Sequence, residues 1–88
     1  MSEARKITDH TEIRKWAEAR GAVPTIVEST EDAKGGGMLR FDFGEREPEL
    51  KRIDWDTFFK TFDQRRLALL AQDEIDGKTS RFFKFVER

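Results

Sequence analysis

The chain has 88 residues, which fits one domain, and its 17 Lys and Arg nearly balance its 18 Asp and Glu at a net charge of −1. This balance argues against non-specific binding to nucleic acid or to an anionic membrane, because both need a cationic surface. Eight Phe and two Trp exclude a disordered chain, while the absence of Cys and of any stretch of about 20 apolar residues predicts a cytoplasmic protein that does not enter a membrane.

The first structured element predicted along the chain is a helix over residues 9–20. Asp9 and Glu12 have the three-residue spacing of a capping box, in which side chains satisfy free backbone N–H groups of the first turn. The residues before it, 1–7, are polar and are expected to form a flexible leader. A single α+β domain is then expected over residues 8–88.

Two strands joined by a glycine-rich loop are predicted next. Residues 22–28 are rich in β-branched side chains and predict a strand, in which Pro24 has no N–H and so must lie at the strand start or on a free edge. A flexible loop is predicted over residues 29–37, which end in three glycines. Residues 38–43 predict a second strand, whose alternation turns one set of side chains toward the core: Leu39, Phe41 and Phe43.

The second half of the chain begins with a charged connector and the clearest helix. Residues 44–52 form the connector, and Asp54 is the predicted N-cap of the helix that follows. Aromatic residues then stand at i, i+3, i+4 and i+7 on one stripe: Trp55, Phe58, Phe59 and Phe62. Two further strands are predicted over residues 67–71 and 81–86, with an Asp-Gly hairpin turn at residues 76–77 between them.

The predicted order is α-β-β-α-β-β, an α+β fold with one four-stranded antiparallel sheet and two helices. The order also contains a candidate duplication of an αββ unit. The apolar stripes of the two helices coincide at a shift of 46, which maps Ile13 onto Phe59, and residues 38–41 coincide with residues 82–85 at a shift of 44. Apolar patterns also coincide by chance, so both interpretations stay open. The residues expected in the core are Trp16, Leu39, Phe41, Trp55, Phe58, Phe59, Phe62 and Phe85.

Several segments carry a resemblance to a known family. They are Thr8-Asp9-His10, Ile13-Arg14-Lys15-Trp16-Ala17-Glu18, Ile53-Asp54-Trp55-Asp56 with Phe58-Phe59, and Ser80-Arg81-Phe82-Phe83-Lys84-Phe85-Val86. Through them the chain resembles a family of short bacterial proteins with no established activity, some of which carry the label 1,4-α-glucan branching enzyme. Glycosyl transfer needs two placed carboxylates in a sugar-binding cleft, and branching enzymes resemble barrels several times longer, so we reject the label. The resemblance implies a family without a function.

Residues with catalytic or ligand-binding chemistry each have a structural explanation. His10 is the single histidine and lies in a helix start, and Asp54 and Asp56 occupy the first turn of a helix. The glycines at 35–37 lack the Lys-Ser/Thr of a phosphate-binding loop and lead into a strand. We therefore predict no catalytic residue, no metal ligand and no cofactor, and an enzyme is the less favoured class.

Strand parity predicts an interaction surface on the face of the sheet that points away from the core. The alternate residues of the two strands form a mixed apolar and charged face there, which also carries Asp42. The candidate interaction residues on this face are Met38, Arg40, Phe82, Lys84 and Val86. This surface predicts a non-catalytic interaction or regulatory module that binds another protein or itself, with Phe82 as the anchor. In the alternative arrangement a helix covers each sheet face and buries these residues.

Two other function classes stay open. A nucleic-acid-binding module would use the same sheet face, through Arg40, Arg81 and Lys84 with Phe82, although the net charge of −1 counts against it. A small-ligand binder or an enzyme would need a concave pocket that the sequence does not reveal. A basic surface patch favours the first class, and a polar cavity favours the second.

Overall fold

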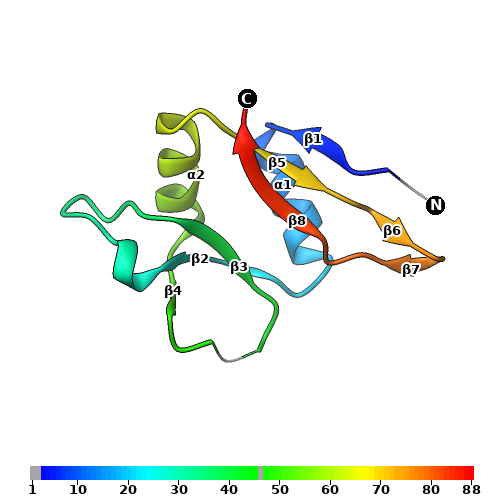
Figure 1. Ribbon diagram of the computed structural model, residues 1–88, viewed down its shortest axis with the longest axis horizontal. Helices are drawn as coiled ribbons and strands as arrows, with labels where there is room; N and C mark the ends of the chain where they lie inside the picture. The colour runs from blue at the N-terminus through cyan, green and yellow to red at the C-terminus, as the bar shows by residue number, and fades with distance from the viewer. Residues whose placement is uncertain (1–2, 46) are drawn as a thin grey trace.

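Two three-stranded antiparallel sheets, two helices and a two-stranded hairpin make up the fold (Figure 1). The computed structural model describes residues 3–45 and 47–88. The elements in chain order are β1 (Arg5–Ile7), α1 (His10–Glu18), β2 (Val23–Val27), the 3₁₀ turn η1 (Glu28–Thr30), β3 (Leu39–Asp42), β4 (Leu50–Arg52), α2 (Trp55–Gln64), β5 (Leu67–Ala71), β6 (Glu74–Ile75), β7 (Lys78–Thr79) and β8 (Phe83–Glu87). The α+β class is confirmed. The single four-stranded sheet is wrong, because the strands form two sheets of order β1-β5-β8 and β3-β2-β4.

The prediction of one sheet failed because two short strands escaped recognition. β1 and β4 are each three residues long and contain two Lys or Arg, so neither shows the apolar alternation of a half-buried strand. Both are edge strands, and β1 pairs with β5 while β4 pairs with β2. With these outer strands in place, β3 and β8 lie side by side without hydrogen-bonded pairing in the part of the chain that the structure describes.

The segment expected as a flexible leader contains β1 and belongs to the domain. Ile7 pairs with Leu69 and is only 3% exposed, so it is part of the core. Arg5 donates two hydrogen bonds to the carboxylate of Asp73, at 2.9 and 3.0 Å. The expected start of the domain after this segment is therefore wrong, while residues 1–2 lie outside the described residues.

Pro24 lies in a centre strand and not at a free edge. β2 is flanked by β3 and β4, and Pro24 is its second residue. The carbonyl oxygen of Pro24 accepts from the amide of Ile53 at 3.1 Å, just past the last residue of β4. The nitrogen of Pro24 therefore faces β4 at the point where the β2–β4 pairing ends, and the ladder is not interrupted there. Of the two predicted positions, the start of a strand is the one observed.

The two halves of the chain repeat one another as a βαββ unit at an offset of 45 residues. β1 corresponds to β4 at this offset, and the N-cap Asp9 of α1 corresponds to the N-cap Asp54 of α2. The turn after each helix contains one residue with left-handed backbone, Gly21 (φ 68°) and Arg66 (φ 52°). The shift of 46 predicted for the helices is wrong by one residue, because their buried positions coincide at 45. These positions are Ile13, Trp16 and Ala17 on α1, and Phe58, Thr61 and Phe62 on α2.

The two halves exchange their first strands. β1 comes from the first half and completes the sheet of the second half by pairing with β5. β4 comes from the second half and completes the sheet of the first half by pairing with β2. Each sheet therefore depends on a strand from the other half of the chain.

The core lies between the two helices and the inner faces of both sheets. Of the residues expected there, the buried ones are Trp16, Leu39, Phe41, Phe58 and Phe62, and the half-buried ones are Trp55, Phe59 and Phe85. On α2 the buried line runs through Phe58, Thr61 and Phe62, so Phe59 turns toward α1, where the ring of His10 stacks on it at 4.1 Å. The four-residue aromatic stripe is thus real, but half of it lies at the border of the core.

Candidate functional site

A groove opens between β3 and β8, the two edge strands that lie side by side in Figure 1. It has a volume of about 460 Å³. Aromatic rings close it toward the core, where the ring centroids of Phe41 and Phe83 are 5.2 Å apart. The residues that line the groove are Met38, Leu39, Arg40, Arg81, Phe83, Lys84 and Phe85.

Three of the five residues predicted for the interaction surface line this groove. Met38 is 53% exposed, and Arg40 and Lys84 are exposed as well. Phe82, which is 46% exposed, and Val86, which is half-buried, are not part of the lining. The arrangement in which helices cover both sheet faces is wrong, because it would bury Met38 and Phe82.

The other lining residues were not part of the predicted interaction surface: three were assigned to the core, and Arg81 was named only for the nucleic-acid alternative. Strand parity assigns Leu39, Phe83 and Phe85 to the core, and they do point inward, but Phe83 and Phe85 stay half-buried because β8 ends its sheet. Arg81 precedes β8, where parity does not reach, and its guanidinium lies 5.3 Å from the ring centroid of Phe43. The position of Arg81 beside an aromatic strand is the signal on which the nucleic-acid alternative had named it.

The rim of the groove is cationic. The guanidinium of Arg40 lies 5.7 Å from the ring centroid of Phe83, and Arg81 makes a 3.6 Å ion pair with Glu45 in which both side chains are more than half exposed. Across residues 3–45 and 47–88, no carboxylate forms an ion pair with Arg40 or with Lys84. The rim therefore offers positive charge to an anionic group from outside.

The backbone of β8 presents hydrogen-bonding groups along its free edge. The amide of Gln72 donates to the carbonyl of Phe82, which sets the phase of the β5–β8 ladder. In this phase Lys84 exchanges hydrogen bonds with β5, while the N–H and C=O groups of Phe83 and Phe85 point away from β5. The strand edge beside the groove is therefore open to a further strand.

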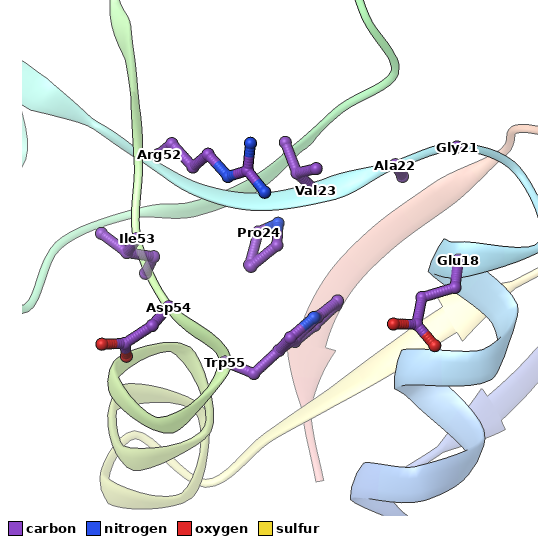
Figure 2. A pocket seen from close by; sticks show the side chains of 9 residues that line it. All are labelled: Glu18, Gly21, Ala22, Val23, Pro24, Arg52, Ile53, Asp54 and Trp55. Atoms are coloured by element: carbon purple, nitrogen blue, oxygen red, sulfur yellow. The ribbon is translucent and has the colours of Figure 1, made fainter.

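A second cavity, of about 700 Å³, lies between the start of α2 and the end of α1 (Figure 2). Trp55 reaches into it from the first turn of α2, with Glu18 across from it on α1. Both carboxylates of this cavity already have partners: Asp54 accepts from the amide of Thr57 at 2.7 Å, and Glu18 pairs with Arg14 at 3.3 Å. The hydrogen bond from the Thr57 amide also lowers the pKa of Asp54, as a helix cap requires. The cavity therefore holds no pair of carboxylates set for general acid–base work.

His10 takes part in a structural cluster. Its ring stacks on Phe59, and its Nε2 lies 2.9 Å from the carboxylate of Asp63. The hydrogen bond with His10, followed by one from Arg88 at 2.6 Å, holds the pKa of Asp63 below its usual range. These contacts join α1 to α2 and to the residue that follows β8.

The described residues contain neither a cluster of metal ligands nor a membrane-spanning helix. No three or more His, Cys, Asp or Glu side chains gather there as a metal site. Within the same residues, no helix has the length and apolar character needed to cross a bilayer.

Comparison with models of protein families, with curated proteins and with solved structures finds no match to this chain. The groove between β3 and β8 combines half-buried rings, a cationic rim and an open strand edge, and no other site described above brings these three features together.

Proposed function

We propose that this protein is a non-catalytic cytoplasmic module that binds another protein through the groove between β3 and β8 together with the exposed side chain of Phe82, which stands in the chain between the lining residues Arg81 and Phe83. The observation that supports the proposal is the meeting of Met38, Arg40 and Lys84 around the half-buried rings of Phe83 and Phe85. Protein interfaces are enriched in Met, Arg and aromatic residues around an apolar centre. Membership of the family of short bacterial proteins that the chain resembles is part of the same proposal, because the resembling segments include both helix caps and β8.

The test compares wild type with Phe82→Ser and with Ile75→Ser as a matched control. The two side chains are exposed to a similar degree, 46% and 44%, but Ile75 lies in the β6–β7 hairpin that projects away from the groove (Figure 1). We expect Phe82→Ser to stay folded by circular dichroism and to weaken association about thirtyfold, which corresponds to about 2 kcal/mol. Affinity capture from host cells with quantitative mass spectrometry measures binding to a partner, and sedimentation velocity measures self-association.

The control and the fold check make this test decisive. Ile75→Ser is expected to associate as wild type does, since its side chain is far from the groove. Equal association of wild type and Phe82→Ser contradicts the proposal. Unfolding of Phe82→Ser also contradicts it, because Phe82 would then serve the core and not a partner.

Binding of nucleic acid is the second candidate, because the groove carries three cations, Arg40, Arg81 and Lys84. Its weakness is that the rings of Phe83 and Phe85 are half-buried, so each is only partly open to a flat base. Arg40 lies over the ring of Phe83, and the ring of Phe85 packs 5.5 Å from that of Phe41. Stacking of bases needs open ring faces. A filter-binding titration with a 20-nucleotide single-stranded RNA at several salt concentrations tests this candidate directly.

A further inference from the structure

The groove is bordered by two strand edges that differ in accessibility. On β3 the outward-pointing backbone groups belong to Leu39 and Phe41, and each of these residues is only 3% exposed. On β8 the corresponding groups belong to Phe83 and Phe85, which are half-buried. An incoming strand therefore finds its hydrogen-bonding partners on β8.

We infer, on the basis of the function proposed above, that the groove takes an extended acidic segment of a partner protein, which pairs as an added strand with the free edge of β8. Side chains of such a strand alternate between two faces. Those on the outer face contact Arg40 and Lys84, and those on the inner face pack against the parts of the Phe83 and Phe85 rings that remain exposed in the half-buried side chains. The partner segment accordingly alternates acidic and apolar residues over about four to six positions, a form of strand addition in which the backbone supplies affinity and the pockets supply specificity.

The charge of the rim separates such a partner from a second copy of this chain. In a twofold dimer formed through the groove, the same patch meets itself. Arg40, Arg81 and Lys84 of one protomer would then face the same three cations of the other, and opposed like charges disfavour association. An acidic segment replaces this repulsion with attraction, so its binding weakens as salt is added.

The experiment selects ligands without assuming a partner. A display library of random 12-residue peptides is selected on the wild-type protein, and the enriched peptides are measured by fluorescence anisotropy. The test variant is Arg40→Glu/Lys84→Glu. The matched control is Lys60→Glu/Lys78→Glu, which changes the net charge equally at exposed positions on α2 and β7. The 20-nucleotide single-stranded RNA is measured in parallel.

We expect the selected peptides to alternate acidic with apolar residues. The Arg40→Glu/Lys84→Glu variant should bind them at least tenfold more weakly than wild type, and the control should bind them within about twofold. Hydrogen exchange followed by NMR supplies a backbone readout. Bound peptide should slow exchange of the amides of Phe83 and Phe85, while the amide of Lys84 is already protected by β5 in the free protein.

The inference is overturned by peptides without acidic enrichment, by the absence of any selected peptide, by equal loss of binding in the test and control variants, or by unchanged exchange at Phe83 and Phe85. RNA binding tighter than that of every peptide overturns it in favour of nucleic acid. Its failure is separable from failure of the proposed function. If capture of a native partner depends on Phe82 but not on Arg40 and Lys84, the proposed interaction module is supported and the inference of an acidic partner strand is contradicted.

Discussion

Arg5 and Asp73 form the contact that anchors β1 to the turn after β5. Two hydrogen bonds from the guanidinium hold the pKa of Asp73 below its usual range. A carboxylate with a lowered folded-state pKa stabilises the protein fully above its unfolded pKa of about 3.9, and the contribution is lost as pH falls through the folded-state value. The gap in melting temperature between wild type and Asp73→Asn is therefore expected to be constant from pH 7 to pH 5 and to narrow below about pH 4.

Thermal unfolding followed by circular dichroism from pH 7 to pH 3 measures this gap. Arg5→Ala removes the other partner of the contact. The difference in melting temperature between wild type and Arg5→Ala is therefore expected to become smaller over the same pH range. A gap for Asp73→Asn that stays constant down to pH 3 would show that the ion pair is not the source of its stability.

The sequence pattern predicts the role of some single side chains correctly and overestimates the burial of others. Asp54 caps α2 as its position in the sequence indicates. Phe59 was expected to be as buried as Phe58, but Phe58 is fully buried while Phe59 borders the helix pair. Spacing identifies the apolar side of a helix, yet the angle at which a second helix crosses it decides which positions are shut off from water.

The turns that end α1 and α2 are equivalent in backbone and unequal in sequence. Gly21 and Arg66 both have positive φ, a conformation that costs a residue with a side chain about 1 kcal/mol and costs glycine little. A methyl group at Gly21 would meet open space, so Gly21→Ala is expected to destabilise by about 1 kcal/mol through backbone strain alone. Arg66→Gly is expected to stabilise, by a smaller amount because glycine gains entropy in the unfolded chain.

Urea denaturation of the two variants measures both effects, and the opposite signs serve as mutual controls. Loss of stability in Arg66→Gly would mean that the Arg66 side chain contributes more than its strained backbone costs.

At the level of elements, the sequence predicts whatever has a local signature. Both helices, β2, β3, β5 and β8 follow from caps, alternation and glycine stops. β1 and β4 were not predicted because a three-residue edge strand with two charged residues shows no apolar alternation, and their partners lie far along the chain. The same limit applies to the groove: parity correctly turned Arg40 and Lys84 outward, but no local pattern reveals that β3 and β8 become neighbours without hydrogen bonds between them.

The exchange of first strands makes the halves of the molecule interdependent. A break in the exposed loop between Gly44 and Glu45 separates the two repeats while leaving every strand pairing intact. Residues 1–44 and 45–88, expressed together as two chains, are expected to assemble into one folded complex, since β1 then binds β5 and β4 binds β2 across the break.

Size-exclusion chromatography and circular dichroism of the co-expressed fragments measure this assembly. Removing residues 1–7 from the first fragment deletes β1 and is expected to weaken the complex. Fragments that separate and fold independently would show that the exchanged strands are not needed to complete either sheet.

The long separation between β1 and its partner has a consequence for synthesis. Ile7 pairs with Leu69, 62 residues further along the chain. A ribosome that adds about 5–20 residues per second needs roughly 3–12 s to make that intervening stretch. During this interval the nascent N-terminal strand has no partner and its isoleucine is open to chaperones or to neighbouring nascent chains. The core is therefore completed only once the second repeat has left the ribosome.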